Sequence, residues 1–515
     1  MRPFFLLLFT FSAVTSYKIL VYSGPLGFSH VQFMGRIADL LHEAGHDVTV
    51  LHQVSNDKHT MTFPKKAKQI LLDLPQEMRV KLNPERYNTW VSTGSMLHQL
   101  QFIRTFVNTQ VEACDMLLGD NRTIEALRKE HFDAGITEMI VTCGFGLFDM
   151  IGVDHIICAS AVGISDAGED FFDVPGLSSF KPSFLTKFSD KMNFMERTIN
   201  FISSFVSKNV IKYMYGEYEI MWQRHGVDRK MEDYRSKINY VLSNSDEFME
   251  IPSPTTAKIV HVGGITIAEK SELPQKFRSL MERKDRTGVV YISFGSLVPT
   301  KQMPNYFRET IFHVASSFPQ ITFLWKMDAD DTPPEIPNLH TFSWLPQQAL
   351  LAHPNLLCFV SHAGLNSVLE LTRSGKPSIL VPVFADQFRN ARLVERKNTT
   401  IVLMKETFNN KTFESALRRI ISDESYGMRA KRLASLMVNK PFPIKERVLS
   451  TVQFSIQHGK INSLDTYGRN LNTLQYYSID VVAFLATIGL LIIISLIRLG
   501  IFCLRKILKK KQKEE

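Results

Sequence analysis

The sequence predicts an α/β protein with two Rossmann-like domains that face one another across a cleft, followed by one C-terminal transmembrane helix. Two series of apolar segments that alternate with helical patterns predict the domains, and an uncharged apolar stretch near the C-terminus predicts the membrane helix. Strands that alternate with helices form parallel sheets, because each helix crosses over the sheet to reach the next strand. At 515 residues the chain is long enough for two or three domains.

The first strand and helix series begins near the N-terminus. YKILVYS predicts a strand, GPLGFSH a turn, VQFMGRIADLLHEAG a helix with apolar residues at helical spacing, and HDVTVL a second strand. Farther along, FDAGIT (132–137) predicts a buried strand that is followed by Glu138. Because ligands bind at the carboxyl ends of parallel strands, we expect Glu138 at a binding edge.

A second series follows residues 249–265, whose Pro, Thr and Gly content is typical of a linker. It contains the apolar segments GVVYISFG, ITFLWKM, LLCFVS and PSILVPV, with helical patterns between them. The expected parts are a signal peptide over 1–16, an N-terminal domain over 17–262, a C-terminal domain over 263–445, a return helix and stalk over 446–475, a transmembrane helix over 476–498 and a basic tail over 499–515.

Both ends of the chain carry targeting patterns. The N-terminus has one Arg, an apolar run and small residues up to Ser16, which is typical of a cleaved secretory signal. Val481–Ile497 has no charged residue and spans roughly 25 Å as a helix, which snorkelling of Arg498 extends toward a membrane thickness. Seven Lys or Arg against two Glu lie from Arg498 onward, so the positive-inside rule predicts a cytoplasmic tail and a lumenal body.

The tail accounts for most of the basic balance of the chain. It supplies +5 of the formal net charge of +9, so no nucleic-acid binding surface is indicated. Lys511 and Lys513 have the spacing of a di-lysine retrieval signal, which predicts the endoplasmic reticulum membrane, although a solvated basic tail has the same composition. Asn121, Asn398 and Asn410 each begin a glycosylation triplet, as fits a lumenal body.

The cysteines show no paired spacing. Neither a zinc site nor a disulfide scaffold is therefore indicated, and buried thiols are the expected state. The five positions are Cys114, Cys143, Cys158, Cys358 and Cys503.

Aromatic residues are concentrated in one stretch of the N-terminal domain. Between Phe171 and Trp222 they are about twice as frequent as in the chain as a whole. This stretch predicts either an aromatic-rich helical core or an apolar cavity or membrane-facing surface for lipophilic molecules.

The stretch SHAGLNSVLE, 361–370, places polar residues where a buried strand ends and a helix begins. Unpaired N–H groups of the first helical turn, close backbone approach at Gly364 and an N–H from His362 would suit a diphosphate. Ser367 and Glu370 are three residues apart, however, which also fits a capping box that serves the helix alone. These ten residues leave both interpretations open.

Residues on either side of this stretch favour a nucleotide-sugar site. Before it, the indole of Trp344 can stack on a flat base and the side chain of Gln347 can read the edge of that base. Within it, the carboxylate of Glu370 can accept from both ribose hydroxyls. After it, Asp386 and Gln387 can hold the hydroxyls of a sugar.

The segment from Trp344 to Gln387 resembles the 44-residue signature of UDP-glycosyltransferases. The whole chain resembles the membrane-bound animal branch of that family, the UDP-glucuronosyl- and UDP-glucosyltransferases, in FDAGITE, VGG, SFGS, WLPQ and FADQ. The resemblance implies a GT-B fold with an N-terminal acceptor-binding domain and a C-terminal UDP-sugar-binding domain. One departure is HAG where many relatives have HGG, and Ala363 is tolerated unless that position needs a positive φ.

The resemblance also implies residue roles. Trp344 would stack on uracil, Gln347 would contact the ribose or base, and Glu370 would hold the ribose diol. Asp386 and Gln387 would hold the transferred sugar. The implied diphosphate contacts are Ser296, His362, Asn366 and Ser367.

No metal ion or other cofactor is expected, and the UDP-sugar is a co-substrate. The helix terminus already supplies charge stabilisation to the diphosphate. Asp328-Ala-Asp330 imitates the Asp-x-Asp metal site of another glycosyltransferase architecture, but it precedes Pro333 and Pro334 in an expected solvated loop.

His30 is the expected general base, because the acceptor oxygen must lose a proton as it attacks the anomeric carbon. Ser29 and Gln32 form a capping pattern that places His30 in the first turn of a helix, whose positive end would keep the ring unprotonated. A carboxylate can orient such a ring and stabilise the imidazolium. The family has an Asp in that role, whereas this chain has Glu138, so the reach differs.

The sequence therefore predicts inverting, metal-independent transfer of a hexosyl group from a UDP-sugar to a hydroxyl of a small lipophilic acceptor in the endoplasmic reticulum lumen. No Lys or Arg lies between Lys237 and Lys258 to meet a glucuronate carboxylate, which favours glucosyl over glucuronosyl transfer. A catalytically weak UDP-sugar or lipophile binding protein or regulatory subunit, and a sugar-nucleotide hydrolase or epimerase, remain alternatives. The chain would contact the membrane through its C-terminal helix, and a homo-oligomer is compatible with the sequence.

Overall fold

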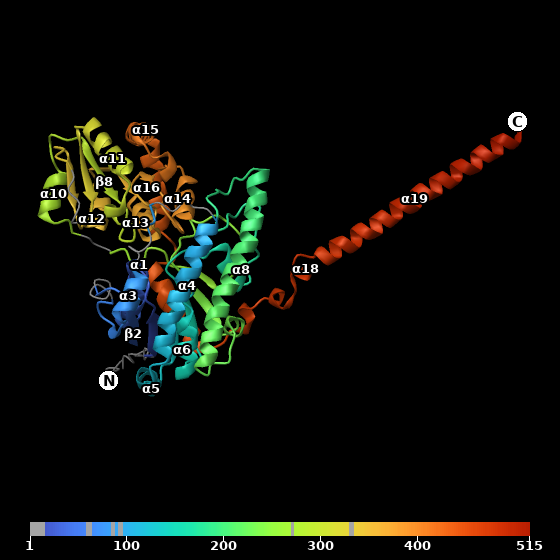
Figure 1. Cartoon of the computed structure of the whole chain (residues 1–515), viewed down its shortest axis with the longest axis horizontal. Helices are drawn as coiled ribbons and strands as arrows, with labels where there is room; N and C mark the ends of the chain where they lie inside the picture. The colour runs from blue at the N-terminus through green and yellow to red at the C-terminus, as the bar shows by residue number, and fades with distance from the viewer. Residues whose placement is uncertain are drawn as a thin grey trace, which may run out of the picture. The chain divides into compact units, whose positions relative to one another are not determined.

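The computed structural model contains two parallel β-sheets with helices packed around them (Figure 1). It describes residues 16–57, 64–83, 88–90, 96–268, 272–328 and 334–514. The expected signal peptide lies outside these residues, apart from Ser16. The chain divides into two compact units, Met1–Ile461 and Asn462–Glu515, which are described separately.

The first sheet has the strand order β3-β2-β1-β4-β5-β6-β7, and every pair of neighbours is parallel. Its central strands are almost wholly buried, as expected for a parallel sheet that is covered on both faces. The strands are β1 (Lys18–Ser23), β2 (Asp47–Val54), β3 (Lys68–Asp73), β4 (Ala134–Glu138), β5 (Ile156–Ser160), β6 (Ile238–Ser243) and β7 (Ile259–His261).

The second sheet repeats this order as β10-β9-β8-β11-β12-β13, again with parallel neighbours. The strands are β8 (Gly288–Ser293), β9 (Ile321–Lys326), β10 (Leu339–Phe342), β11 (Leu356–Ser361), β12 (Ser378–Leu380) and β13 (Thr400–Val402).

Each sheet reverses its strand order at its centre. In the first sheet β1 lies beside β4, and in the second β8 lies beside β11. The loops that leave two such strands run to opposite sides and make room for a ligand at the carboxyl ends. The predicted class of two Rossmann-like domains is confirmed.

Helices cover both sheets. Those of the first domain are α1 (Phe28–Glu43), α3 (Gln76–Leu82), α4 (Met96–Leu118), α5 (Asn121–Lys129), α6 (Cys143–Ile151), α7 (Asp166–Phe171), α8 (Phe194–Arg224) and α9 (Met231–Arg235). Those of the second are α10 (Gln275–Met281), α11 (Asn305–Ser317), α12 (Gln347–Ala352), α13 (Leu365–Ser374), α14 (Gln387–Glu395), α15 (Asn410–Ser422) and α16 (Ser425–Val438). The next helix, α17 (Ile444–His458), returns to the first domain, where Val448 and Val452 share a core cluster with Ile19 of β1.

The expected linker over 249–265 is only partly irregular. Residues 259–261 form β7, which pairs with β6 at the edge of the first sheet. The Pro and Thr content ends short of this strand, so composition alone gave no sign of it.

The two interpretations of the aromatic stretch apply to different halves of α8. Tyr218 and Trp222 in its C-terminal half are buried in the core of the first domain. Phe194, Phe201 and Phe205 in its N-terminal half are 74%, 67% and 67% exposed. The helix therefore combines a core segment with an apolar surface segment.

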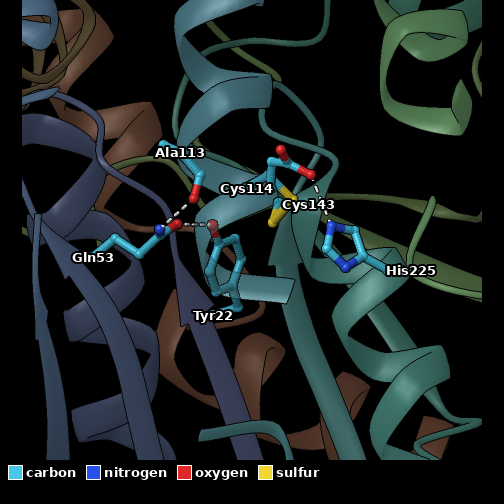
Figure 2. Close-up of a disulfide and its surroundings, with 7 residues drawn as sticks. Tyr22, Gln53, Ala113, Cys114, Cys143 and His225 are labelled. Atoms are coloured by element: carbon cyan, nitrogen blue, oxygen red, sulfur yellow. Dashed lines mark hydrogen bonds and ion pairs between the residues drawn. A yellow bond between two sulfur atoms is a disulfide. The ribbon is translucent and has the colours of Figure 1, made fainter. Parts of the chain in front are cut away.

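Cys114 of α4 and Cys143 at the start of α6 form a disulfide, with Cα atoms 5.6 Å apart (Figure 2). The prediction of buried thiols is wrong for this pair, because the two residues meet only when α4 packs beside α6. Close by, Gln53 accepts from the hydroxyl of Tyr22 at 2.8 Å and donates to the carbonyl of Ala113 at 2.7 Å. The other described cysteines are the buried thiols Cys158 and Cys358 and the exposed Cys503.

The second unit contains one long apolar helix, α19 (Ile479–Glu514), preceded by the short α18 (Thr473–Tyr476). By length and composition, Ile479–Lys510 is able to cross a membrane, because it contains an 18-residue stretch with a mean hydropathy of 2.6 that is not buried. The basic residues that the sequence assigns to a separate tail continue this helix.

Candidate active site

His30 and Glu138 lie in direct contact at the carboxyl edge of the first sheet. His30 is the third residue of α1, directly after β1, and Glu138 is the last residue of β4, the neighbouring strand. The Nδ1 atom of His30 lies 2.8 and 2.9 Å from the two carboxylate oxygens of Glu138. One of these oxygens also accepts from the backbone N–H of Ala161 at 3.0 Å. The extra methylene of Glu138 therefore still permits a close pair.

The charge environment of His30 differs from the expected one. Burial lowers the pKa of His30, but the charge and hydrogen bond of Glu138, together with the charge of Asp386, outweigh burial and raise it. The net shift is therefore opposite in direction to the one expected from the position of His30 at a helix terminus. The expected cap of α1 is also wrong, because the N-cap is Gly27 without a side-chain bond, and Gln32 points elsewhere.

The N-terminus of α13 has a glycine where a ligand would approach the backbone closely. Its N-cap is Gly364, where a Cβ would lie 2.4 Å from Nε2 of His362, so the two residues are in tight contact. Burial and the charge of Lys326 lower the pKa of His362 to about 4, so this ring is neutral near pH 7 and carries one N–H donor. Ala363 has a φ of +66°, the left-handed conformation that glycine adopts most easily, so this position does need a positive φ.

Glu370 is held by two glutamines rather than by a helix cap. Gln347 donates to one of its oxygens at 2.6 Å and Gln348 to the other at 2.8 Å. Gln347 also donates to Ser367 at 3.1 Å. The capping-box interpretation of Ser367 and Glu370 is wrong, because α13 begins at Leu365 and has no side-chain cap.

Trp344 and Ser296 occupy exposed positions beside this cluster. The indole of Trp344 is 67% exposed, and the Nζ of Lys326 lies 5.7 Å from its ring centroid. Ser296 follows Gly295, whose φ is +80° and where a Cβ would lie 2.6 Å from the ring of His362. The SFGS loop and the start of α13 therefore meet at His362.

Asp386 and Gln387 begin α14. Asn390 donates to Asp386 at 2.7 Å, and burial raises the pKa of Asp386 despite this bond and the nearby charge of His30. The Oε1 atom of Gln387 accepts from the backbone N–H groups of residues 383 and 384, at 2.9 and 3.1 Å. Gln387 thus fixes its own loop, and its amide N–H group is the part that remains for a sugar.

Asn366 joins the two domains. Its amide group donates to Gln32 of α1 at 3.2 Å, and its carbonyl oxygen accepts from Asn244, which follows β6, at 2.8 Å. The carboxyl edges of both sheets therefore meet at Asn366. The pKa effect of Asp386 on His30 agrees with this proximity.

No group of three or more His, Cys, Asp and Glu side chains within the described ranges is arranged to hold a metal ion. The carboxylate of Asp328 accepts from the backbone N–H of Lys301 at 3.1 Å, and Asp330 lies outside those ranges.

Lys326 and Gln348 contact the candidate site, and the sequence did not point to either of them. Lys326 ends β9 and donates to the carbonyl of Gly295 at 2.9 Å, between Trp344 and His362. The rule that ligands bind at the carboxyl ends of strands would have found it in the segment ITFLWKM. No sequence pattern pointed to Gln348, because the WLPQ motif ends at its neighbour Gln347.

Known proteins match this chain over nearly its whole length. The family described as "UDP-glucoronosyl and UDP-glucosyl transferase" matches residues 17–514. A Caenorhabditis elegans protein that carries the name UDP-glucuronosyltransferase ugt-50 is 30% identical over 512 residues, covering 97% of this chain and 95% of the relative. Mouse UDP-glucuronosyltransferase 1A6 is 27% identical over 511 residues, covering 98% and 94%.

Solved structures show the same fold. The glycosyltransferase VinC, in complex with DTDP, superposes with a TM-score of 0.59 at 13% identity, covering 86% of this chain and 100% of VinC. The two parallel sheets and the contact between their carboxyl edges fit this GT-B architecture. The chain therefore belongs to the UDP-glucoronosyl and UDP-glucosyl transferase family and is a UDP-glycosyltransferase, an enzyme that transfers sugar from a UDP-sugar.

Proposed function

We propose that this enzyme transfers a neutral hexosyl group, glucosyl in preference to glucuronosyl, from a UDP-sugar to a hydroxyl of a small lipophilic acceptor. The transfer is a single displacement with inversion and needs no metal ion. The observation that carries the proposal is the His30–Glu138 contact beside Asp386.

The chemistry follows from this contact. With Nδ1–H donated to Glu138, the Nε2 atom of His30 carries the lone pair that takes the acceptor proton. The acceptor oxygen then forms a bond to the anomeric carbon while the bond from that carbon to the UDP oxygen breaks. Glu138 stabilises the imidazolium that results, as a buried carboxylate does in other His-dependent catalysts.

The leaving UDP would rest on the second domain. The first turn of α13 offers unpaired N–H groups, and neutral His362 can add another. Lys326 supplies the positive charge that the sequence did not identify. Trp344 would stack on uracil and Glu370 would accept from the ribose hydroxyls. Asp386 and Gln387 would hold the sugar.

The acceptor is proposed to be lipophilic because of α8. The exposed Phe194, Phe201 and Phe205 give the first domain an apolar surface of the kind that contacts lipids or apolar molecules. The apolar α19, whose C-terminal end is basic, favours a membrane-anchored enzyme whose catalytic unit is lumenal. Asn121, Asn398 and Asn410 are exposed, as glycosylation in that compartment requires.

The test is a matrix of UDP-sugars against hydroxylated aglycones. Microsomes that contain the full-length chain would be incubated with each combination, and products would be identified by mass spectrometry with the anomeric configuration read by NMR. Acceptor-dependent formation of a β-glucoside from an α-linked donor is expected, also in the presence of EDTA. Release of UDP without any acceptor product, or a product of retained configuration, would contradict the proposal.

A further inference from the structure

Glu250 and Arg389 form a buried ion pair between the two domains. Glu250 follows β6 of the first sheet, and Arg389 is the third residue of α14, two positions after Gln387. The NH2 and NH1 atoms of Arg389 lie 2.5 and 3.3 Å from the two carboxylate oxygens of Glu250. The side chains are only 14% and 15% exposed, so the pair is largely removed from water.

This pair lies beside the catalytic residues. Ala161, in the loop after β5, donates to Glu138 at 3.0 Å. Two residues later in the same loop, a Cβ on Gly163 would lie 3.0 Å from NH1 of Arg389 and 3.2 Å from Oε1 of Glu250. One short loop therefore contacts both the catalytic carboxylate and the ion pair.

The pair also lies near the proposed sugar ligand Asp386. Burial raises the pKa of Asp386, whereas the charges of His30 and Arg389 both act to lower it. Asp386 thus lies within electrostatic range of the catalytic base and of Arg389.

The cations near this position already have carboxylate partners. The charge of Arg389 is balanced by Glu250, and the buried Lys181 is paired with Glu169. Burial opposes the ionisation of Glu250, but Arg389 outweighs it, so the pKa of Glu250 is lowered and the carboxylate is charged at pH 7. The segment after β6, which contains no Lys or Arg up to Lys258, thus contributes a negative charge here.

We propose that Glu250 determines sugar specificity by holding Arg389 in this closed pair. A hexose with a neutral C6 hydroxymethyl group is accepted, because it needs no positively charged partner in the site. A uronate with a C6 carboxylate is excluded, because Arg389 is already occupied and Glu250 repels the incoming charge. This inference rests on the proposed function and names a residue that decides which donor that function uses.

The test compares donors in full-length enzyme from microsomes. Glu250→Gln keeps the size of the side chain and releases Arg389 from its ion pair. The ratio of kcat/KM for UDP-glucuronate to that for UDP-glucose should rise about tenfold or more. Glu250→Asp, which keeps the charge, should stay near the wild-type ratio. Glu250→Gln combined with Arg389→Met removes the cation and should lose the gain.

A second ion pair, at the C-terminal end of α14, supplies a matched control. Arg396, the C-cap residue of α14, has its Nε atom 2.5 Å from a carboxylate oxygen of Asp190 in the first domain. If these ion pairs only hold the domains together, Asp190→Asn and Glu250→Gln should both scale the two donors equally. An equal effect of Glu250→Gln on both donors would overturn the inference and leave an interdomain contact alone.

Binding to the wild-type enzyme gives an independent measurement if Glu250→Gln is not recovered in folded form. The inhibition constant of UDP-glucuronate, measured in competition with UDP-glucose, should be at least about tenfold higher than the dissociation constant of UDP-glucose. Equal or tighter binding of UDP-glucuronate overturns the inference while sugar transfer stands. If the wild-type enzyme transfers no sugar from any donor, the proposed function fails first, and the inference fails with it.

Discussion

The Nδ1 atom of His30 lies between the two carboxylate oxygens of Glu138, 2.8 and 2.9 Å away, although 108 residues separate them in the chain. In the proposed mechanism, Nδ1–H is donated to Glu138, and the other ring nitrogen takes the proton of the acceptor. The predictions that follow start from this pair and move outward to the nucleotide site and the scaffold.

His30→Ala should abolish sugar transfer while the affinity for UDP stays within about threefold of wild type, because α13 and Glu370 are untouched. Transfer would be followed by product mass spectrometry and UDP binding by calorimetry. His42→Ala, at the exposed end of the same helix, is the control and should keep full activity. Turnover by His30→Ala above a few per cent of wild type would remove His30 from the mechanism.

Activity should fall on acidification. A general base must be neutral, and Glu138 and Asp386 raise the pKa of His30 above its ordinary value of about 6.5. The plot of log kcat/KM against pH should therefore rise with unit slope and level off above that pKa. Glu138→Gln removes the main cause of the raised pKa, so its acidic limb should move to lower pH while its plateau is lower. An unmoved limb in Glu138→Gln would show that another group titrates.

Glu370→Gln should weaken UDP binding by about tenfold, since an amide accepts only through one oxygen where the carboxylate accepts through two. A ribose-modified ligand makes the test specific. 2′-Deoxy-UDP should bind the wild-type enzyme more weakly than UDP, but it should bind Glu370→Gln almost as well as UDP does. If the preference for the 2′-hydroxyl persists in Glu370→Gln, the ribose contact belongs to another residue.

Ala363→Gly should be nearly neutral for stability. The left-handed backbone of Ala363 costs roughly 1–2 kcal/mol, which glycine relieves, whereas loss of the buried methyl group costs about 0.8 kcal/mol and unfolded-state entropy adds a similar amount. Ala391→Gly, in the interior of α14 with an equally buried methyl, gains no such relief and should lower thermal stability clearly. Equal losses in the two variants, measured by thermal shift, would contradict a strained Ala363.

Cys143→Ser should lower stability by about 3 kcal/mol, because the disulfide with Cys114 closes a loop of 29 residues in the unfolded chain. The thermal inactivation temperature should drop, and dithiothreitol should have the same effect on the wild type. Cys503→Ser, at an exposed free thiol, is the control and should change neither quantity. Wild-type thermostability in Cys143→Ser would show that packing of α4 against α6 suffices without the bond.

Local pattern in the sequence was enough to predict seven strands of the two sheets, namely β1, β2, β4, β8, β9, β11 and β12, and the place of the candidate site residues along the chain. It did not predict β3, β5, β6, β7, β10 or β13. Continuous apolar runs followed by polar residues mark where parallel strands end, and His30, Glu138 and His362 all follow such runs. Because β1 pairs with β4 and β8 with β11, these strand ends lie at the centre of each sheet. Helix caps were predicted less well. A Ser and a Glu three residues apart fit a capping box, but the Glu can instead bind a neighbouring helix, as Glu370 does when it accepts from Gln348 of α12.

Contacts between distant segments were decided only by tertiary structure. The disulfide of Cys114, the exposure of Phe201 and the pairing of Glu250 with Arg389 depend on which elements pack together, and no local pattern encodes a distance across that packing. The sequence by itself determined the alternation of strands and helices in both domains, the order of the candidate site residues and the family. The fold alone decided that an acid 108 residues away reaches His30, because two neighbouring parallel strands end at the same edge.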